Sequence, residues 1–124
     1  MSTRDAPAEA RIFHLALARD WDAAQADGWY RISTLGSSVD EVGFLHASFA
    51  GQLAGVAEAH YADVTEPLVL LMIDRSRVGA PVVDEVVPAA SGAVFPHVYG
   101  PLNVDAVVDA RPVSRDGAGR LDLP

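Results

Sequence analysis

One uninterrupted apolar run, residues 68–73, sets the strongest limit on how this chain can fold. Side chains of a strand point alternately to the two faces of its sheet, so a strand that is apolar at every position is covered on both faces. The run is also far shorter than the roughly 20 apolar residues of a membrane span. The sequence therefore predicts that residues 68–73 form a central strand of a sheet.

The other elements follow the hydrophobic pattern in an irregular order. Residues 11–17 alternate as a strand does, with Ile12, His14 and Ala16 on one face. Two helices are expected, at residues 18–26 and 49–61, and further strands or extended segments at residues 29–33, 43–47, 81–87, 94–98 and 104–113. Residues 34–42 are expected to form a polar loop. Because this order lacks a regular βαβ alternation, we predict an α+β fold, with two main helices on a mostly antiparallel, split β-sheet.

The length and composition suit a single domain. The chain has 124 residues, of which 50% are hydrophobic, enough to bury one core. Residues 1–10 are polar and rich in alanine, and they are expected to form a flexible N-terminal tail. Residues 114–124 are rich in glycine and aspartate and are expected to form a loose C-terminal tail. The single α+β domain is therefore predicted to span residues 11–113.

The charge and the missing residue types exclude several classes of function. The chain has no cysteine, which excludes disulfides, thiolate catalysis and cysteine-based zinc sites. It has no lysine, which excludes Schiff-base chemistry. The formal net charge of −8 opposes binding to nucleic acid and to anionic membranes. With no secretory signal and no apolar run that could span a membrane, a cytoplasmic protein with a small-molecule partner is expected, and its oligomeric state is left open.

Three histidines lie within, or at the end of, apolar segments that should form the core. They are His14, His46 and His97. Histidine changes its charge and its hydrogen-bonding role most readily near neutral pH. If the fold brings the three side chains together, they line a pocket, and they are therefore the candidate catalytic residues. The alternative for His14 is a core histidine whose hydrogen bonds are satisfied.

The residues around these histidines add candidate ligand-binding groups. His46 is expected just before a helix N-terminus, where free N–H groups favour anions. Ser48 either caps that helix or reaches a ligand with its hydroxyl. Tyr99 shares a rigid, proline-flanked loop with His97, and such a loop suits binding or forms a structural corner.

The sequence offers few candidate groups for binding a phosphate or a metal ion. Tyr30 and Arg31 are also candidate ligand-binding residues, and Arg31 is the arginine best placed to meet a phosphate. The three histidines could bind zinc, as in catalytic three-histidine sites. No pair of histidines has a close ligand spacing such as HxH or HxxxH, so no metal is expected. The fourth histidine, His60, is expected to have a structural role near the end of a helix.

Three segments together resemble a small, mainly bacterial family known only as a domain of unknown function, DUF952. The matching segments are residues 12–14, 43–48 and 95–102, and the second and third are the specific ones. The resemblance extends over about residues 11–113. It implies membership of the family and no established activity.

A more distant resemblance is to the ADP-ribosyltransferase superfamily, and within it to the RNA 2′-phosphotransferase branch. That branch has a histidine on its first strand, a later His-Val-His-Leu-Ser run that opens a helix, and an apolar strand that ends in an acid. Here His14, residues 44–48 and residues 68–74 are similar. The resemblance implies an ADP-ribosyltransferase-like fold and NAD as a cofactor, with His14 at its ribose or nicotinamide and His46 in the nicotinamide pocket. The branch also has an arginine shortly before its histidine run, where residues 42–44 hold none.

The sequence thus predicts an uncharacterised protein with a histidine-lined pocket that binds a nucleotide such as NAD, or another small ligand. In this pocket His14 and His46 are expected to share one cleft, with His97 or Tyr99 at its rim.

Two enzymatic functions are alternative hypotheses to simple ligand binding. The first is an NAD-dependent ADP-ribosyl- or phosphotransferase-type enzyme, in which a carboxylate helps the nicotinamide to leave, and Asp84 or Glu85 is the candidate. The superfamily's third motif position falls near His97 or Val98. The second is a hydrolase or transferase that uses the histidines as acid and base.

Overall fold

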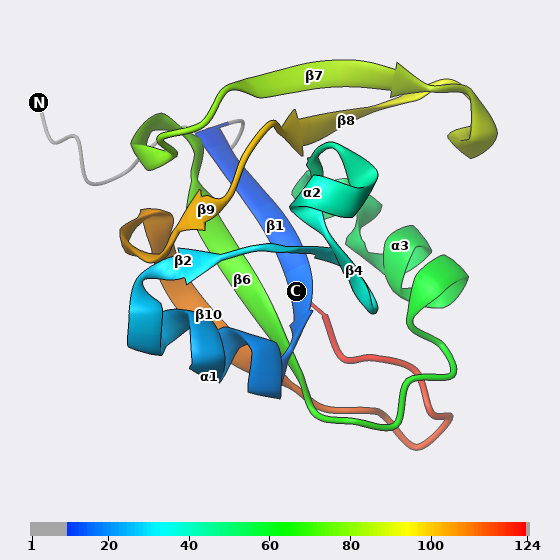
Figure 1. Cartoon of the computed structure of the whole chain (residues 1–124). Coiled ribbons are helices and arrows are strands. Elements are labelled where there is room, and N and C mark those ends of the chain that lie inside the picture. The colour runs from blue at the N-terminus through cyan, green and yellow to red at the C-terminus, as the bar shows by residue number, and fades with distance from the viewer. Residues whose placement is uncertain (1–9, 124) are drawn as a thin grey trace, which may run out of the picture.

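The computed structural model describes residues 10–123, and its main sheet has three antiparallel strands. They are β1 (Arg11–Leu17), β6 (Leu68–Asp74) and β10 (Val107–Val113), in the order β1-β6-β10. Figure 1 shows these strands crossing the middle of the molecule side by side. β6 is the central strand, as its apolar sequence predicts, because both of its edges pair with a neighbouring strand.

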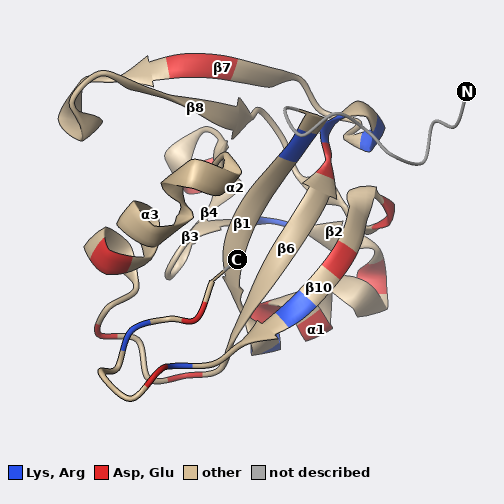
Figure 2. Cartoon of the chain, turned by 180° about the vertical axis from the view of Figure 1, so that it is seen from behind, with Lys and Arg blue, Asp and Glu red and all other residues tan. Residues whose placement is uncertain are grey.

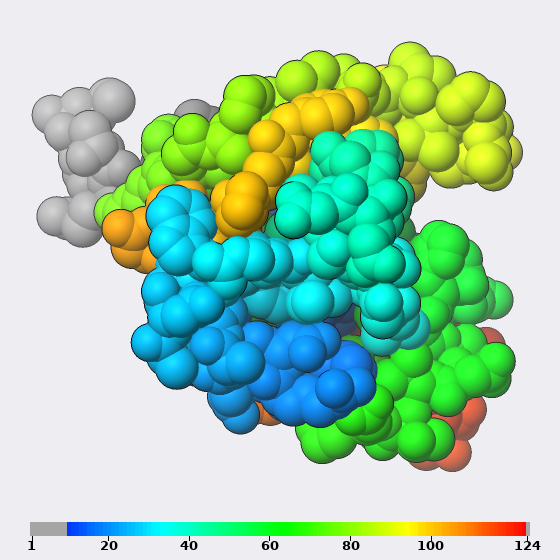
Figure 3. Space-filling model, in the orientation of Figure 1, coloured from blue at the N-terminus to red at the C-terminus, as the bar shows by residue number. Residues whose placement is uncertain are grey.

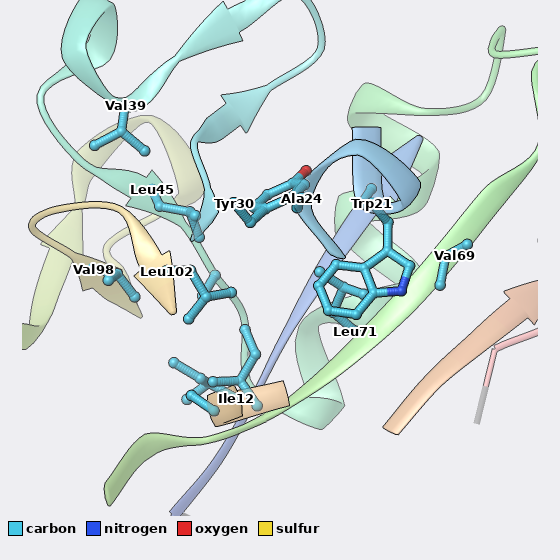
Figure 4. Packing of buried hydrophobic residues seen from close by; sticks show 14 residues of the cluster. Ile12, Trp21, Ala24, Tyr30, Val39, Leu45, Val69, Leu71, Val98 and Leu102 are labelled. Carbon is cyan, nitrogen blue, oxygen red and sulfur yellow. The ribbon is translucent and has the colours of Figure 1, made fainter. Parts of the chain in front are cut away.

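Both faces of this sheet are covered by other parts of the chain. On one face, Ile12 of β1 and Leu71 of β6 join Trp21 of α1 (Ala18–Asp27) in a hydrophobic cluster (Figure 4). On the other face, the alternate residues of the same strands pack against α3 (Leu53–His60). The two-sided burial is the physical reason for the uninterrupted apolar run in β6.

A second antiparallel sheet lies beside the first. It holds β5 (Leu45–His46), β8 (Ala93–Val98) and β7 (Val82–Val87), in the order β5-β8-β7. β7 and β8 are joined through η4 (Pro88–Ala90) into a hairpin that spans the top of the molecule in Figure 1. Figure 3 shows the tip of this hairpin standing clear of the body, whereas Val98 at its root is fully buried.

The remaining elements are short. They are two antiparallel strand pairs, β2 (Trp29–Tyr30) with β9 (Leu102–Asn103) and β3 (Ile32–Thr34) with β4 (Ser37–Ser38), and the single turns η3 (Arg75–Arg77) and η5 (Val104–Ala106). The predicted fold class is confirmed: the structure is α+β, its described strands pair antiparallel, and α1 and α3 are the two main helices. The likeness to ADP-ribosyltransferases stays a prediction.

Two local interpretations of the sequence are wrong. The segment 34–42, expected as a polar loop, contains β4 and a short helix, α2 (Val39–Val42). The Ser38 hydroxyl accepts a hydrogen bond from the Glu41 N–H, and the Glu41 carboxylate accepts one from the Ser38 N–H. This reciprocal capping makes a helix of a segment whose composition is typical of a loop.

The second helix begins later than expected. A single turn, η2 (Ala50–Gln52), precedes α3, and the residue before that turn is Phe49. Ser48 therefore does not cap the helix. Its backbone N–H and C=O instead pair with Phe13 of β1.

The C-terminal segment, expected as a loose tail, packs against α3. Leu121 and Leu123 are half-buried on the hydrophobic cluster of that helix, and Arg115 pairs with Leu121 in a β-bridge. The Arg115 guanidinium donates hydrogen bonds to the carbonyl oxygens of Tyr61, Val64 and Gly119. The expected N-terminal tail, apart from Ala10, lies outside the described residues. None of the helices described between residues 10 and 123 has the length and apolar composition that a membrane crossing requires.

Candidate functional site

Four rings meet on one face of the second sheet. We call Phe44, His46, His97 and Tyr99, together with Glu85, the imidazole–aromatic cluster. His46 of β5 lies directly opposite His97 of β8, so that both side chains project from the same face, and their ring centroids are 5.8 Å apart. Phe44 stacks on His97 at 4.0 Å and lies 4.8 Å from His46 and 5.6 Å from Tyr99.

Glu85 holds His97 in a fixed orientation. Its Oε1 lies 2.9 Å from His97 Nδ1, and the same oxygen accepts a hydrogen bond from the Tyr99 hydroxyl. Because an ionised carboxylate only accepts hydrogen bonds, His97 Nδ1 carries a proton and the Nε2 position is left for another partner. The hydrogen bonds from Tyr99 and then from His97 lower the pKa of Glu85, and the bond to Glu85 raises the pKa of Tyr99.

The cluster is open to solvent on one side. Tyr99 is 40% exposed, the Glu85 side chain is 37% exposed, and His46 is exposed. The His97 side chain, beneath Phe44, is only 8% exposed. Partial burial is the main cause that lowers the pKa of His46, and positive charge on His97 and His60 is the lesser cause. The neutral form of His46 therefore predominates at neutral pH.

His14 is held in the core and touches the backbone of His46. Its Nδ1 lies 2.5 Å from the His46 carbonyl oxygen, and its Nε2 lies 2.9 Å from the Tyr30 hydroxyl. Burial lowers the pKa of His14 to about 4, so the ring is neutral. A carbonyl cannot donate, so Nδ1 is the protonated nitrogen and Nε2 accepts from Tyr30. Both ring nitrogens are therefore already bonded within the protein.

A second buried side chain, that of Ser33, contacts the backbone of the segment that carries Phe44 and His46. The hydroxyl of Ser33, which is fully buried, donates a 2.5 Å hydrogen bond to the Phe44 carbonyl oxygen. Gly43, at the end of α2, has a φ of 103°, and this left-handed conformation turns the chain into Phe44. Sequence reasoning missed Ser33, because a serine within a short strand carries no signal of its partner.

The other candidate residues lie apart from the cluster. Arg31 forms a surface ion pair with Asp27 at 2.9 Å, and Tyr30 is buried against His14. Ser48 is buried and paired with β1, so His46 does not stand at a helix N-terminus as expected.

The structure separates the two candidate carboxylates. Glu85 joins the cluster, whereas Asp84 points to the opposite face of β7 and pairs with Arg75 at 2.7 Å. Among residues 10–123, no group of three or more histidine, aspartate or glutamate side chains is placed to hold a metal ion.

A separate groove of about 490 Å³ lies between α3 and the C-terminal segment. Its lining includes Ala57, Glu58, Arg115 and Leu121, and none of the cluster residues. The residues of the imidazole–aromatic cluster therefore do not line this groove. They form a surface on the second sheet.

Comparisons with known proteins bear on the family. A sequence profile described as "Protein of unknown function (DUF952)" matches residues 15–110. The crystal structure of protein CC0527 from Caulobacter crescentus is similar, with 31% identity, a TM-score of 0.76, and coverage of 90% of this chain and 93% of that chain. The solution NMR structure of CC0527 gives 31% identity and a TM-score of 0.72, with coverage of 90% of each chain. No curated protein matches this chain.

The profile match spans most of the described residues, and the similarity to CC0527 extends over nearly the whole of both chains. The resemblance carried by the three histidine segments is thereby confirmed at the level of the family. The chain belongs to the DUF952 family of proteins of unknown function.

Proposed function

We propose that the protein binds a small-molecule ligand on the imidazole–aromatic cluster, and that a nucleotide such as NAD is the ligand class to test first. The observation that carries the proposal is the meeting of four rings on one solvent-accessible face. One of these rings, His97, is oriented by the Glu85 carboxylate. Aromatic rings offer surfaces on which a base or a nicotinamide stacks, and imidazole nitrogens add directional hydrogen bonds.

The geometry supports different tasks for the three candidate histidines. His46 would contact the ligand, because it is exposed on that face of the second sheet, whereas His97, 8% exposed beneath Phe44, would lie below the ligand and support the stacked ring. His14 would act through the backbone of His46, because its own nitrogens are bonded to that carbonyl and to Tyr30. The cytoplasmic location and the lack of nucleic-acid and membrane partners remain predictions from composition.

A second candidate function is acid–base catalysis at the same place, and the exposed imidazole of His46, beside the Glu85–His97 pair, favours it. In an NAD-linked transfer, the bond between nicotinamide and ribose would break with its electron pair leaving on nicotinamide. An acceptor hydroxyl would then bond to the ribose carbon and give its proton to His46, whose neutral form can accept it. Glu85 would stabilise positive charge that develops nearby.

The binding proposal is tested by NMR titration of the protein with NAD while the imidazole signals of the four histidines are followed. We expect saturable shifts at His46 and His97, and we expect Phe44→Leu to weaken them. Val108→Ala, an exposed change on β10, is the matched control and should leave the titration unchanged. Absence of shifts at millimolar NAD would exclude NAD as the ligand. Release of nicotinamide by the wild type, but not by His46→Gln, would identify the enzyme.

A further inference from the structure

We propose that the ligand of the imidazole–aromatic cluster is an organic cation of the N-alkylpyridinium or quaternary ammonium class, held by the Glu85 carboxylate and the rings of Phe44 and Tyr99. This inference rests on the proposed function, because it names the charge of the ligand at the same site. In NAD, such a cation is the nicotinamide end of the molecule, and the phosphates are the anionic part.

The first support is the second carboxylate oxygen of Glu85, Oε2. Both hydrogen bonds to Glu85, from His97 and from Tyr99, end on Oε1. Among the described residues, Oε2 has no hydrogen-bond or ion-pair partner, and the side chain is 37% exposed. The lowered pKa of Glu85 keeps it ionised at neutral pH. A negative charge is therefore presented at the rim of the cluster.

The second support is the character of the surrounding rings. The face of an aromatic ring is electron-rich and attracts cations that come within about 6 Å of its centre. Tyr99, with 40% of its surface exposed, presents such a ring beside Glu85, and Phe44 lies 5.6 Å from Tyr99. An ionised carboxylate bonded to one aromatic residue, Tyr99, with a second ring, Phe44, packed near that residue, is a suitable site for a flat or quaternary nitrogen cation.

The third support is the scarcity of positive charge around the site. β5 and β8 carry no arginine, and the charged residues of β7 are both acidic (Figure 2). Arg75, in the turn η3 that precedes β7, is engaged by Asp84 and by the Val82 carbonyl oxygen. His46 is mostly neutral at neutral pH, so it does not repel a cation. The formal net charge of −8 adds a long-range attraction for cations.

The experiment compares 1-methylnicotinamide, a pyridinium cation, with nicotinamide, which is neutral and lacks only the N-methyl group. Binding of each compound to the full chain is measured by NMR at low salt. We expect the cation to bind about tenfold more tightly, which is the scale of a favourable cation–π contact aided by a charge.

Two matched variants assign this preference to one carboxylate. Glu85→Gln should reduce the preference several-fold, to the part that the rings of Phe44 and Tyr99 supply, because the amide keeps the shape and loses the charge. Asp84→Asn removes the same charge from the preceding residue of β7, whose side chain lies on the opposite face, and should leave the preference intact. Unchanged backbone spectra of both variants show that the fold is retained.

The possible failures are distinguishable. If the two compounds bind equally well, the cation inference is wrong and the proposed ligand site stands. If Glu85→Gln keeps the preference, the assignment to Glu85 is wrong. If neither compound shifts His46 or His97 at millimolar concentration, the proposed ligand site fails together with the inference.

Discussion

At the scale of single residues, His14 joins two parts of the molecule. A neutral imidazole has one donor and one acceptor on opposite sides of the ring. In the core these are matched by the His46 carbonyl oxygen and the Tyr30 hydroxyl. A leucine at this position would fill similar space and leave both groups unsatisfied. The histidine therefore stabilises the fold and fixes the backbone that carries His46.

The lowered pKa of His14 predicts a specific loss of stability in acid. The folded chain binds this proton only near pH 4, whereas the unfolded chain binds it near the ordinary histidine pKa of 6.5. Stability from this group is therefore fully present above pH 6.5 and is lost as the pH falls from 6.5 toward 4. The loss reaches on the order of 3 kcal/mol of unfolding free energy at the low end. Urea unfolding between pH 7.5 and pH 4 measures it.

His14→Gln is the informative variant for this prediction. A glutamine amide can also donate to a carbonyl and accept from a hydroxyl, and it does not titrate in this range. We expect the variant to show a flatter stability curve between pH 4 and pH 6.5 than the wild type does. His60→Gln serves as the control, because His60 is exposed at the end of α3. Equal slopes for the wild type and His14→Gln would contradict the assignment.

The Tyr30 hydroxyl gives a second prediction at this scale. Tyr30→Phe removes the donor to His14 Nε2 and leaves a buried acceptor without a partner. Such a group costs about 1 to 3 kcal/mol. Tyr99→Phe removes a hydroxyl that bonds to Glu85 at the surface, and it should change stability little. Chemical denaturation of both variants tests the contrast, and a Tyr30→Phe protein as stable as Tyr99→Phe would refute it.

At the scale of elements, periodicity predicted the long segments well. The central strand β6 and the strand β1 follow directly from their apolar patterns. The short helix α2 was missed, because four residues give no helical period and its stability comes from reciprocal capping. The capping interpretation of Ser48 is wrong: a serine before a helix is typical of a cap, yet the turn η2 follows Phe49, and the Ser48 backbone pairs with Phe13 of β1.

The capping of α2 can be tested directly. Ser38→Ala removes the acceptor for the Glu41 N–H, and we expect a loss of about 1 kcal/mol of unfolding free energy. Because α2 ends at Gly43, immediately before Phe44, the same change should shift the backbone signals of Phe44 and His46. Ser37→Ala is the matched control in the same strand. The prediction fails if both variants have the same stability and the same spectra.

At the scale of the whole molecule, the candidate site arises where the two sheets meet. The segment 44–48 pairs with β8 through His46 and with β1 through Ser48. His46, His97 and Tyr99 could be chosen from the sequence, because each is a reactive group in an apolar or rigid segment. The meeting of His97 and Tyr99 at Glu85, with His46 opposite His97, could not be predicted, because it depends on the register of strands that lie far apart in the chain.

The C-terminal segment contributes to the stability of the whole molecule, and a chain that ends at Val113 should show it. Leu121 and Leu123 are half-buried against α3, and their removal exposes apolar surface worth about 2 kcal/mol or more. The truncation also frees the carbonyl oxygens of Tyr61 and Val64 that Arg115 satisfies.

Arg115→Gln in the full-length chain separates these two contributions, because it keeps both leucines and loses the guanidinium contacts. We expect both proteins to unfold at a lower urea concentration than the wild type, and the truncated chain to be affected more.

The truncated chain should also expose α3, so the amide protons near Leu53 and Ala57 should exchange faster with solvent. Since the imidazole–aromatic cluster lies on the other sheet, its ring signals should change little. A truncated chain as stable as the full-length protein would mean that α3 is held by the main sheet alone.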